Sequence, residues 1–160
     1  MIVFTTIDSP VGPLLLAADA DGLRLIEFSQ PRHPVKRSAE WLEGTLPVLD
    51  ATRTQLDEYF AGRRTGFDLP LSPQGTLFQR DIWAALAQIP YGQTVSYGAV
   101  ATRVGHAGAM RAIGAAVGRN PVPIVVPCHR VMGADGSMTG FSGGLPVKRQ
   151  LLVLEGALPA

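Results

Sequence analysis

Cysteine is almost absent from this sequence, because Cys128 is the only one among 160 residues. A single thiol cannot form an internal disulfide, so nothing indicates an oxidising compartment. No apolar run approaches the ~18 residues of a membrane span, and the N-terminus lacks the basic start and long apolar stretch of a secretory signal. We therefore expect a cytoplasmic protein with no membrane partner.

Charged residues are also few, at 17%, whereas hydrophobic residues make up 46% of the chain. This balance is typical of a globular protein and argues against disorder. Acidic residues are scarce in the second half: residues 1–75 carry 7 Lys or Arg and 10 Asp or Glu, but residues 76–160 carry 7 and 3. The second half would attract a phosphate backbone, although ordinary scatter of surface charge explains the asymmetry equally well.

Metal and cofactor signals are missing. The chain has three histidines, and neither His33 nor His106 has plausible ligand partners nearby in sequence. The glycine-rich stretch 133–144 is not a phosphate-binding loop, because it lacks the Gly-Lys-Ser/Thr ending of such loops. We expect no metal and no cofactor.

The first third of the chain predicts a small antiparallel sheet covered by a helix. Apolar and β-branched segments at 1–7, 14–18 and 23–28 alternate with turn-forming residues, which favours a three-stranded meander. The segment 49–60 places Leu49, Leu56 and Tyr59 on one helical face, and Gly62 follows where a C-terminal cap belongs.

The remainder predicts a mainly helical region. Thr76 and Gln79 have the spacing of a capping box at the start of a helix that ends before Pro90. Two shorter helices are expected at 97 to about 104, capped by Ser96, and at about 107–117, which match a helix-turn-helix. The sequence thus indicates an α+β protein with an N-terminal domain at 1–73 and a C-terminal domain at 76–160.

The second of these short helices is unusually slender. Apart from Arg111 it carries almost no long polar side chain, and Gly108 and Gly114 both reduce helix stability. Small residues allow either tight packing between helices or close approach of another surface. A helix that reads bases in the major groove would offer several long polar side chains, so this one is poorly suited to recognise a sequence.

Cys128 and His129 form a possible nucleophile and base. The run 121–127 contains three prolines and reads as a buried strand or extended segment leading to the cysteine. A thiol becomes nucleophilic as thiolate, and an adjacent base or cation promotes that form. However, neighbours on an extended segment point in opposite directions, and a free cysteine is commonly just buried. The dipeptide alone leaves both interpretations open.

The sequence around Cys128 resembles the active-site signature of the O6-alkylguanine-DNA alkyltransferases, the methylated-DNA–protein-cysteine methyltransferase family. The similarity extends in order through IPYG at 89–92, SYG at 96–98, AMRAIG at 109–114, NPVPI at 120–124, PCHRV at 127–131, SGG at 142–144 and LLVLEG at 151–156. A weaker match covers TIDSP at 6–10 and GPL at 12–14. The resemblance implies a ribonuclease H-like N-terminal domain and a C-terminal domain that binds DNA and transfers the alkyl group.

The resemblance also implies catalytic roles. Cys128 matches the alkyl acceptor, His129 the base that removes its proton through a water, and Glu155 the carboxylate that orients the imidazole. Tyr97 matches the residue whose hydroxyl donates to the departing guanine. Asn120 matches the residue whose side chain braces the turn before the active-site segment.

For DNA, the resemblance implies minor-groove binding by the slender helix. Arg111 matches the residue that enters the base stack in place of a flipped nucleotide, with Ala112, Gly114 and Tyr97 also contacting DNA. Such a small helix suits binding to alkylated double-stranded DNA with little sequence preference.

The base pocket would be lined by Val131 and by Phe141, Ser142 and Gly143 of the glycine-rich loop. Phe141 departs from the tyrosine of many relatives, which removes one hydroxyl contact to the base and puts the alkyl-group preference in doubt. The N-terminal zinc ligands of some relatives are also missing.

The resemblance therefore implies direct-reversal DNA repair, with irreversible transfer from O6-alkylguanine to Cys128 and one turnover per molecule. O4-alkylthymine is a second candidate substrate. We expect a monomer in solution, and the sequence leaves cooperative assembly on DNA open. The main alternative is a non-catalytic alkyltransferase-like protein that binds lesions, but such proteins lack the reactive cysteine. A Cys-His hydrolase is disfavoured because no oxyanion-hole motif is visible.

Overall fold

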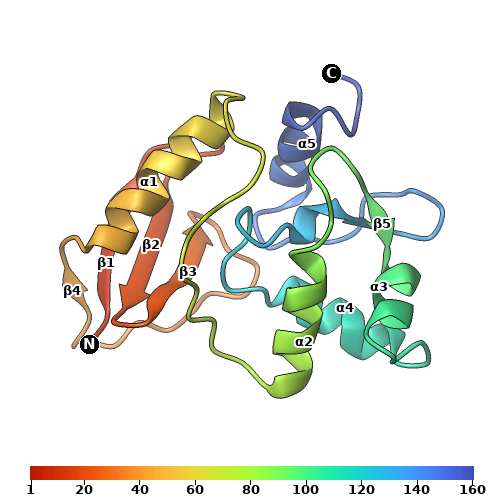
Figure 1. Ribbon diagram of the computed structural model, residues 1–160, viewed down its shortest axis with the longest axis horizontal. Helices are drawn as coiled ribbons and strands as arrows, with labels where there is room; N and C mark the ends of the chain where they lie inside the picture. Colours follow the sequence, from red (N-terminus) through yellow and green to blue (C-terminus); the bar gives the residue numbers. More distant parts are fainter.

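The computed structural model describes residues 1–160, and Figure 1 shows two parts side by side. One part is a four-stranded sheet with a helix on one face. Its elements are β1 (Val3–Ile7), β2 (Leu14–Asp19), β3 (Gly22–Phe28), β4 (Leu42–Glu43) and α1 (Pro47–Phe60). The strand order is β3-β2-β1-β4, with β1, β2 and β3 antiparallel and β4 parallel to β1. The predicted meander and its covering helix are confirmed, and Gly62 has the positive φ of 76° expected after a helix end.

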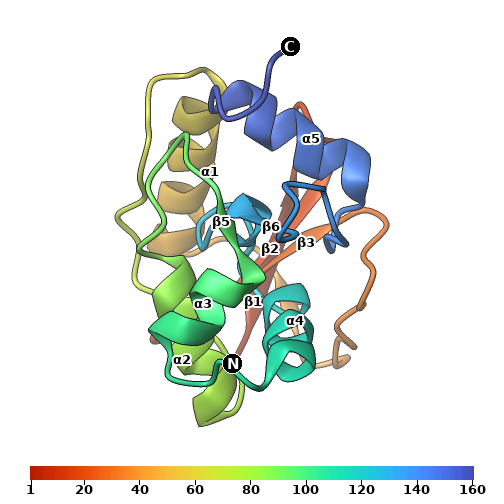
Figure 2. The same cartoon turned by 90° about the vertical axis from the view of Figure 1, so that its right-hand side faces the viewer.

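The second part is mainly helical. Its elements are α2 (Leu77–Leu86), β5 (Val95–Ser96), α3 (Tyr97–Arg103), α4 (Met110–Gly118), a 3₁₀ turn (Cys128–Arg130), β6 (Val131–Met132) and α5 (Leu145–Leu154). In Figure 2, α3 and α4 lie near one end of the molecule, and α5 lies at the other. The capping box forms as predicted, because Thr76 accepts from the amide of Gln79 while the Gln79 side chain accepts from the amide of Thr76.

A single hydrophobic core of 26 buried residues runs through both parts. It includes Leu16 of β2 and Tyr59 of α1, and also Ile82 of α2 and Leu151 of α5. The amide of Ile26 in β3 donates to the carbonyl of Pro121, so the backbone also links the two parts directly. This shared core positions the C-terminal turns against the N-terminal sheet.

Three predictions about local structure are wrong. The sheet has a fourth strand, β4, which the sequence did not indicate because it is two exposed residues long after a proline-containing loop. Helix α4 begins at Met110 rather than near residue 107, so Gly108 lies outside it. The segment before Cys128 is not a strand: Val126 donates to the carbonyl of Val122, and this closes a tight turn. None of the five helices has an apolar stretch long enough to cross a membrane.

Trp83 fixes the position of α4 relative to α2. Its indole is 4% exposed, and Nε1 donates to the carbonyl oxygen of Ala116 at 2.8 Å. The benzene ring of the same indole packs against Gly75, where an added Cβ would lie 2.5 Å from a ring carbon. The side chain therefore connects the segment before α2 with α2 itself and α4.

We predict that Trp83→Phe lowers the free energy of unfolding by about 2 kcal/mol, because it removes a buried hydrogen bond and leaves a void. Urea unfolding measures this change. Trp41→Phe is the matched control, since Trp41 is only partly buried in a loop, and should cost less than about 1 kcal/mol. Equal losses in the two variants would contradict the role assigned to Trp83.

Candidate active site

The cysteine is presented by a strained turn. Ile124, which is 1% exposed, has a φ of 74°, a left-handed conformation that β-branched residues rarely adopt. Such a residue costs about 1–3 kcal/mol and persists only where its surroundings impose it. The Asn120 side chain supplies part of that constraint, because Oδ1 accepts from the amide of Val122 at 3.1 Å and Nδ2 donates to the carbonyl of Val126 at 2.8 Å. Asn120 thus spans the turn that leads into Cys128.

The Cys128 thiol is buried and protonated at neutral pH. Cys128 is 5% exposed and begins the 3₁₀ turn, so it does not lie on an extended segment as the sequence suggested. Burial raises the pKa of the thiol to about 11, although the Asn120 side chain and the Lys148 cation oppose this rise. Cys128 and His129 make no direct side-chain hydrogen bond. An isolated thiol in this position would be inert, and a base is needed to make it react.

Glu155 is a buried carboxylate that accepts from three side chains. Its side chain is fully buried, at the C-terminal end of α5. Oε2 accepts from Tyr59 Oη at 2.5 Å and from His129 Nε2 at 2.7 Å, while Arg130 donates from Nε to Oε1 at 2.7 Å and from Nη2 to Oε2 at 3.0 Å. Burial alone would raise the pKa of Glu155, but the hydrogen bonds from His129, Arg130 and Tyr59 outweigh it and hold the pKa at about 2.

The charge on Glu155 determines the protonation of His129. Because an ionised carboxylate only accepts, the contact at 2.7 Å requires that Nε2 of His129 carries the proton and donates it. Burial lowers the pKa of His129 below 6.5, and the hydrogen bond and charge of Glu155 only partly oppose this, so the ring is neutral. The proton-free nitrogen is then Nδ1, the only buried side-chain nitrogen or oxygen without a hydrogen-bond partner. This arrangement leaves a buried base next to the cysteine in sequence.

A short parallel pairing brings Tyr97 toward the cysteine turn. Val95 and Ser96 of β5 pair with Val131 and Met132 of β6, so the start of α3 lies beside the end of the 3₁₀ turn. The half-buried Tyr97 hydroxyl oxygen accepts from Thr139 Oγ1 at 2.8 Å. Since Thr139 supplies this proton, the hydroxyl proton of Tyr97 is available to another acceptor.

The predicted pocket loop packs against the N-terminal sheet. Phe141 is 4% exposed, and its ring centroid lies 5.4 Å from that of Phe28 at the end of β3. A Cβ at residue 143 would lie 2.9 Å from the Phe28 ring, so only glycine fits there without a shift. Ser142 is partly buried, and its carbonyl accepts from the amide of Arg32. The N-terminal part thereby helps to shape this loop.

Lys148 of α5 connects the start and the middle of the same loop by hydrogen bonds. Its side chain is completely buried on α5, and Nζ donates to the carbonyl of the buried Val131 at 2.7 Å and to that of Thr139 at 3.3 Å. Burial lowers the pKa of Lys148, and the Cys128 charge raises it. A cation near the thiol favours the thiolate, so Lys148 is suited to assist its formation.

The outer face of α4 is small and open. Met110, Arg111, Ala112 and Ala115 are exposed, whereas Ile113, Ala116 and Val117 are buried. A Cβ added at Gly114 would meet no atom within 4 Å. Tight packing between helices of this chain therefore does not account for the glycine, and the helix is slender on a side that faces away from the protein.

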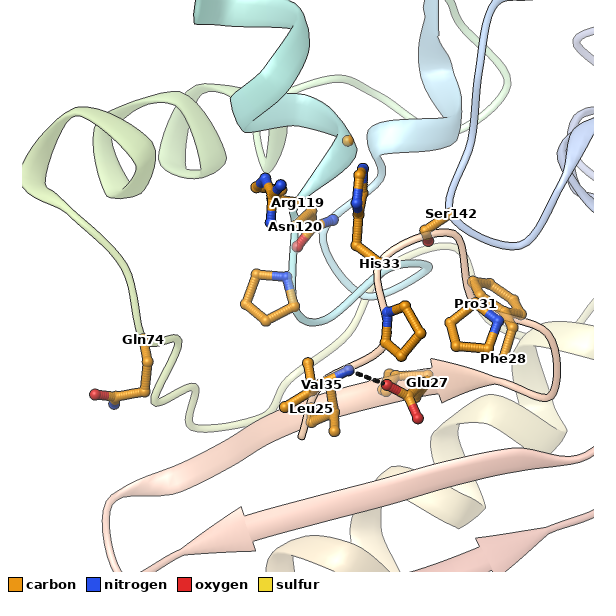
Figure 3. A pocket seen from close by; sticks show the side chains of 14 residues that line it. Leu25, Glu27, Phe28, Pro31, His33, Val35, Gln74, Arg119, Asn120 and Ser142 are labelled. Atoms are coloured by element: carbon orange, nitrogen blue, oxygen red, sulfur yellow. Dashed lines mark hydrogen bonds between the residues drawn. The ribbon is translucent and has the colours of Figure 1, made fainter. Parts of the chain in front are cut away.

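A cavity of about 190 Å³ lies between the end of α4 and the segment after β3. Figure 3 shows His33 on that segment, with Arg119 and Asn120 coming from the end of α4. Asn120 and Ser142 are the only residues that this cavity shares with the predicted site, and Cys128 does not line it. We therefore do not assign this cavity to the reacting base.

The sequence interpretation missed four residues of the site: Tyr59, Arg130, Thr139 and Lys148. Tyr59 was expected only as part of the apolar face of a helix, and Arg130 only as part of the matched motif. Nothing in the local pattern distinguishes a buried lysine such as Lys148 from an exposed one. The described residues contain no cluster of three or more His, Cys, Asp or Glu side chains that could hold a metal ion.

Two family models match nearly the whole chain. Residues 77–157 match the DNA-binding domain of 6-O-methylguanine DNA methyltransferase, and residues 2–73 match its ribonuclease-like domain. The methylated-DNA–protein-cysteine methyltransferase of Methanosarcina acetivorans is 45% identical over 154 residues, which cover 96% of this chain and 98% of that protein. The protein of the same name from Mycobacterium tuberculosis is 46% identical over 155 residues, which cover 97% of this chain and 93% of that protein.

Solved structures agree with these matches. The crystal structure of Mycobacterium tuberculosis OGT in complex with DNA aligns with a TM-score of 0.89 and 44% sequence identity, covering 97% of this chain and 93% of that one. The structure of the O6-methylguanine methyltransferase of the same organism aligns with a TM-score of 0.88 and covers 100% of this chain and 96% of that one. The α+β architecture, the buried Cys128 turn and the matched models lead to one conclusion: the chain belongs to the 6-O-methylguanine DNA methyltransferase family, the methylated-DNA–protein-cysteine methyltransferases.

Proposed function

We propose that this protein repairs alkylated DNA by moving the alkyl group from O6-alkylguanine to Cys128, once per molecule. The observation that carries the proposal is the buried hydrogen bond between Glu155 and His129, which leaves Nδ1 of the imidazole proton-free on the residue that directly follows an otherwise inert thiol. A thiol with a pKa of about 11 is almost entirely protonated at neutral pH, so it needs a base that takes its proton as it reacts.

These positions support the following reaction. His129 Nδ1 takes the thiol proton through a water, and the sulfur attacks the alkyl carbon. The new S–C bond forms as the C–O6 bond breaks, and the electron pair leaves with guanine. Tyr97 donates its hydroxyl proton to the departing base, which neutralises the developing charge. Solvent then returns a proton to the Tyr97 phenolate and takes one from the His129 imidazolium, so that overall the alkyl group and the thiol proton exchange places. The thioether cannot be reversed by thiol exchange, and the chain has no second cysteine.

The open face of α4 supports DNA binding through the minor groove. The helix presents Arg111 beside the small residues Ala112 and Gly114, and a groove only about 6 Å wide favours a slender element. We propose that Arg111 enters the stack where the alkylated nucleotide leaves it. Because so few polar side chains face outward, we expect little sequence preference.

Several further expectations belong to this proposal. The base pocket is formed by Val131 with Phe141, Ser142 and Gly143, and O4-alkylthymine is a second candidate substrate. Residues 1–73 and 76–160 act as the N-terminal and C-terminal domains. The protein is a cytoplasmic monomer before it binds DNA, and cooperative assembly on DNA is open to direct test.

Alkyl transfer predicts a fixed change in mass. After incubation with double-stranded DNA that contains O6-methylguanine, intact-mass spectrometry should show a gain of one methyl group per protein molecule. Cys128→Ser should gain none, because a serine hydroxyl is a much weaker nucleophile than a thiolate. A methyl gain that persists in Cys128→Ser would refute the assignment of the acceptor.

Arg111→Ala should slow transfer from a duplex by about 10- to 100-fold, because the side chain offsets an unstacking energy of a few kcal/mol. On single-stranded DNA with the same lesion the loss should be much smaller, since the base is already unpaired. Single-turnover rates on both substrates measure the difference. Arg53→Ala, an exposed position on α1, is the control and should leave both rates unchanged. An equal loss of rate on double-stranded and single-stranded DNA would show that Arg111 does not act by entering the base stack.

The pH dependence of transfer should reflect His129. Burial lowers its pKa below the ordinary 6.5, so the ring stays neutral and basic from alkaline pH down to below that value. We therefore predict that the single-turnover rate is nearly constant above neutral pH and falls only below pH 6.5. A rate that instead rises steadily toward pH 11 would mean that the free thiolate of Cys128 reacts without a base.

A further inference from the structure

One member of the Glu155 network comes from the N-terminal half of the chain. Tyr59 lies near the end of α1 and is completely buried. Its ring packs edge-on against Phe60 and Tyr91 and is tilted against Phe67, with centroid distances of 5.2, 6.3 and 5.5 Å. Within this aromatic cluster the Tyr59 hydroxyl reaches out 2.5 Å to Oε2 of Glu155, 96 residues later in the chain.

Tyr59 and His129 share one carboxylate oxygen. Oε2 accepts from Tyr59 Oη at 2.5 Å and from His129 Nε2 at 2.7 Å, whereas the two contacts of Arg130 are divided between Oε1 and Oε2. Burial, followed by the charge of Glu155, raises the pKa of Tyr59 above its ordinary value of 10. The phenol therefore remains protonated and donates at every pH at which the protein works.

We propose that Tyr59 is a positioning residue for alkyl transfer, which fixes Oε2 of Glu155 and limits how strongly this oxygen holds the His129 imidazole. The inference rests on the proposed function, because it assigns Tyr59 to the same reaction. Through this contact, a residue of the N-terminal half acts on the base of the C-terminal half without touching Cys128 or the substrate.

Removing the hydroxyl has a defined effect on the base. Without the Tyr59 donor, Oε2 carries more uncompensated charge and interacts more strongly with a protonated imidazole, so the pKa of His129 rises. The other titratable groups stay in place: Arg130 on the same turn and Lys148 on α5 act on His129, and Tyr91 in the loop after α2 acts only on Tyr59. More of the imidazole is then protonated near neutral pH, and less of it can accept the thiol proton.

Tyr59→Phe keeps the ring and removes only this hydroxyl. We expect the single-turnover rate of methyl transfer from O6-methylguanine DNA to fall by about tenfold at neutral pH, the effect typical of losing one hydrogen bond to a charged group. The acidic limb of the pH-rate profile should move to higher pH. Tyr91→Phe is the matched control, because it removes a hydroxyl from the same cluster that contacts only the Leu154 carbonyl, at 3.5 Å.

Because each molecule reacts once, a single experiment measures the fraction of folded protein and the reaction rate separately. The amplitude of methyl uptake counts correctly folded molecules, while the rate constant reports the site, so a partly unfolded variant remains interpretable. A rate and acidic limb equal to those of the unaltered protein and of Tyr91→Phe would overturn the inference. A lower amplitude with no shift of the limb would show a merely structural role and would overturn it as well.

A double-mutant cycle with Glu155→Gln tests whether Tyr59 acts through the carboxylate. In the Glu155→Gln background, Tyr59→Phe should change the rate by less than about twofold, because the group on which the phenol acts is gone. If the rate losses of Tyr59→Phe and Glu155→Gln simply multiply in the double variant, Tyr59 does not act through Glu155 and the inference is overturned. If the unaltered protein itself takes up no methyl group, the proposed function fails, and this outcome is distinct from a normal rate in Tyr59→Phe.

Discussion

The rest of the site depends on the hydrogen bonds that compensate the buried negative charge of Glu155. A carboxylate without solvent is costly unless donors surround it, and here Tyr59, His129 and Arg130 meet that requirement from two different parts of the chain. Arg130 also donates from Nη1 to the carbonyl of Ile89 at 2.7 Å, which connects the network to the loop that follows α2. One charge thus orients the imidazole, holds the cysteine turn and joins the two halves of the protein.

The proposed single use of each molecule places a particular demand on the thiol. A permanently ionised thiol would be exposed to oxidation and unwanted alkylation, because reactivity follows thiolate character. Burial keeps Cys128 protonated, and in the proposed reaction the neutral His129 takes its proton while Lys148 favours the thiolate. The strained turn at Ile124, spanned by Asn120, keeps the thiol in a fixed position. The site therefore combines low background reactivity with readiness for a single displacement.

Local signals allowed much of the fold to be predicted. The Thr76 capping box, the Ser96 cap and the meander depend on neighbouring residues, and the sequence reports such features directly. The short strand β4 could not be predicted, because its pairing with β1 depends on a partner far away in sequence. The role of Tyr59 could not be predicted for the same reason, because its hydroxyl contacts a residue 96 positions later. Nor could that of Lys148, because its burial results from the folding of the pocket loop around it. The family resemblance named His129 and Glu155, which the structure joins by a hydrogen bond of 2.7 Å, but it gave no information on how the charge of Glu155 is compensated.

We infer that Glu155 fixes His129 as the tautomer that carries its proton on Nε2. Nitrogen NMR of the imidazole in the free protein at neutral pH tests this most directly, because protonated and proton-free ring nitrogens have well-separated chemical shifts. We predict a protonated Nε2 that is hydrogen-bonded to Glu155 and a proton-free Nδ1, and we predict that Glu155→Gln disturbs this state. A ring protonated on Nδ1, or an imidazolium with both nitrogens protonated at neutral pH, would contradict it.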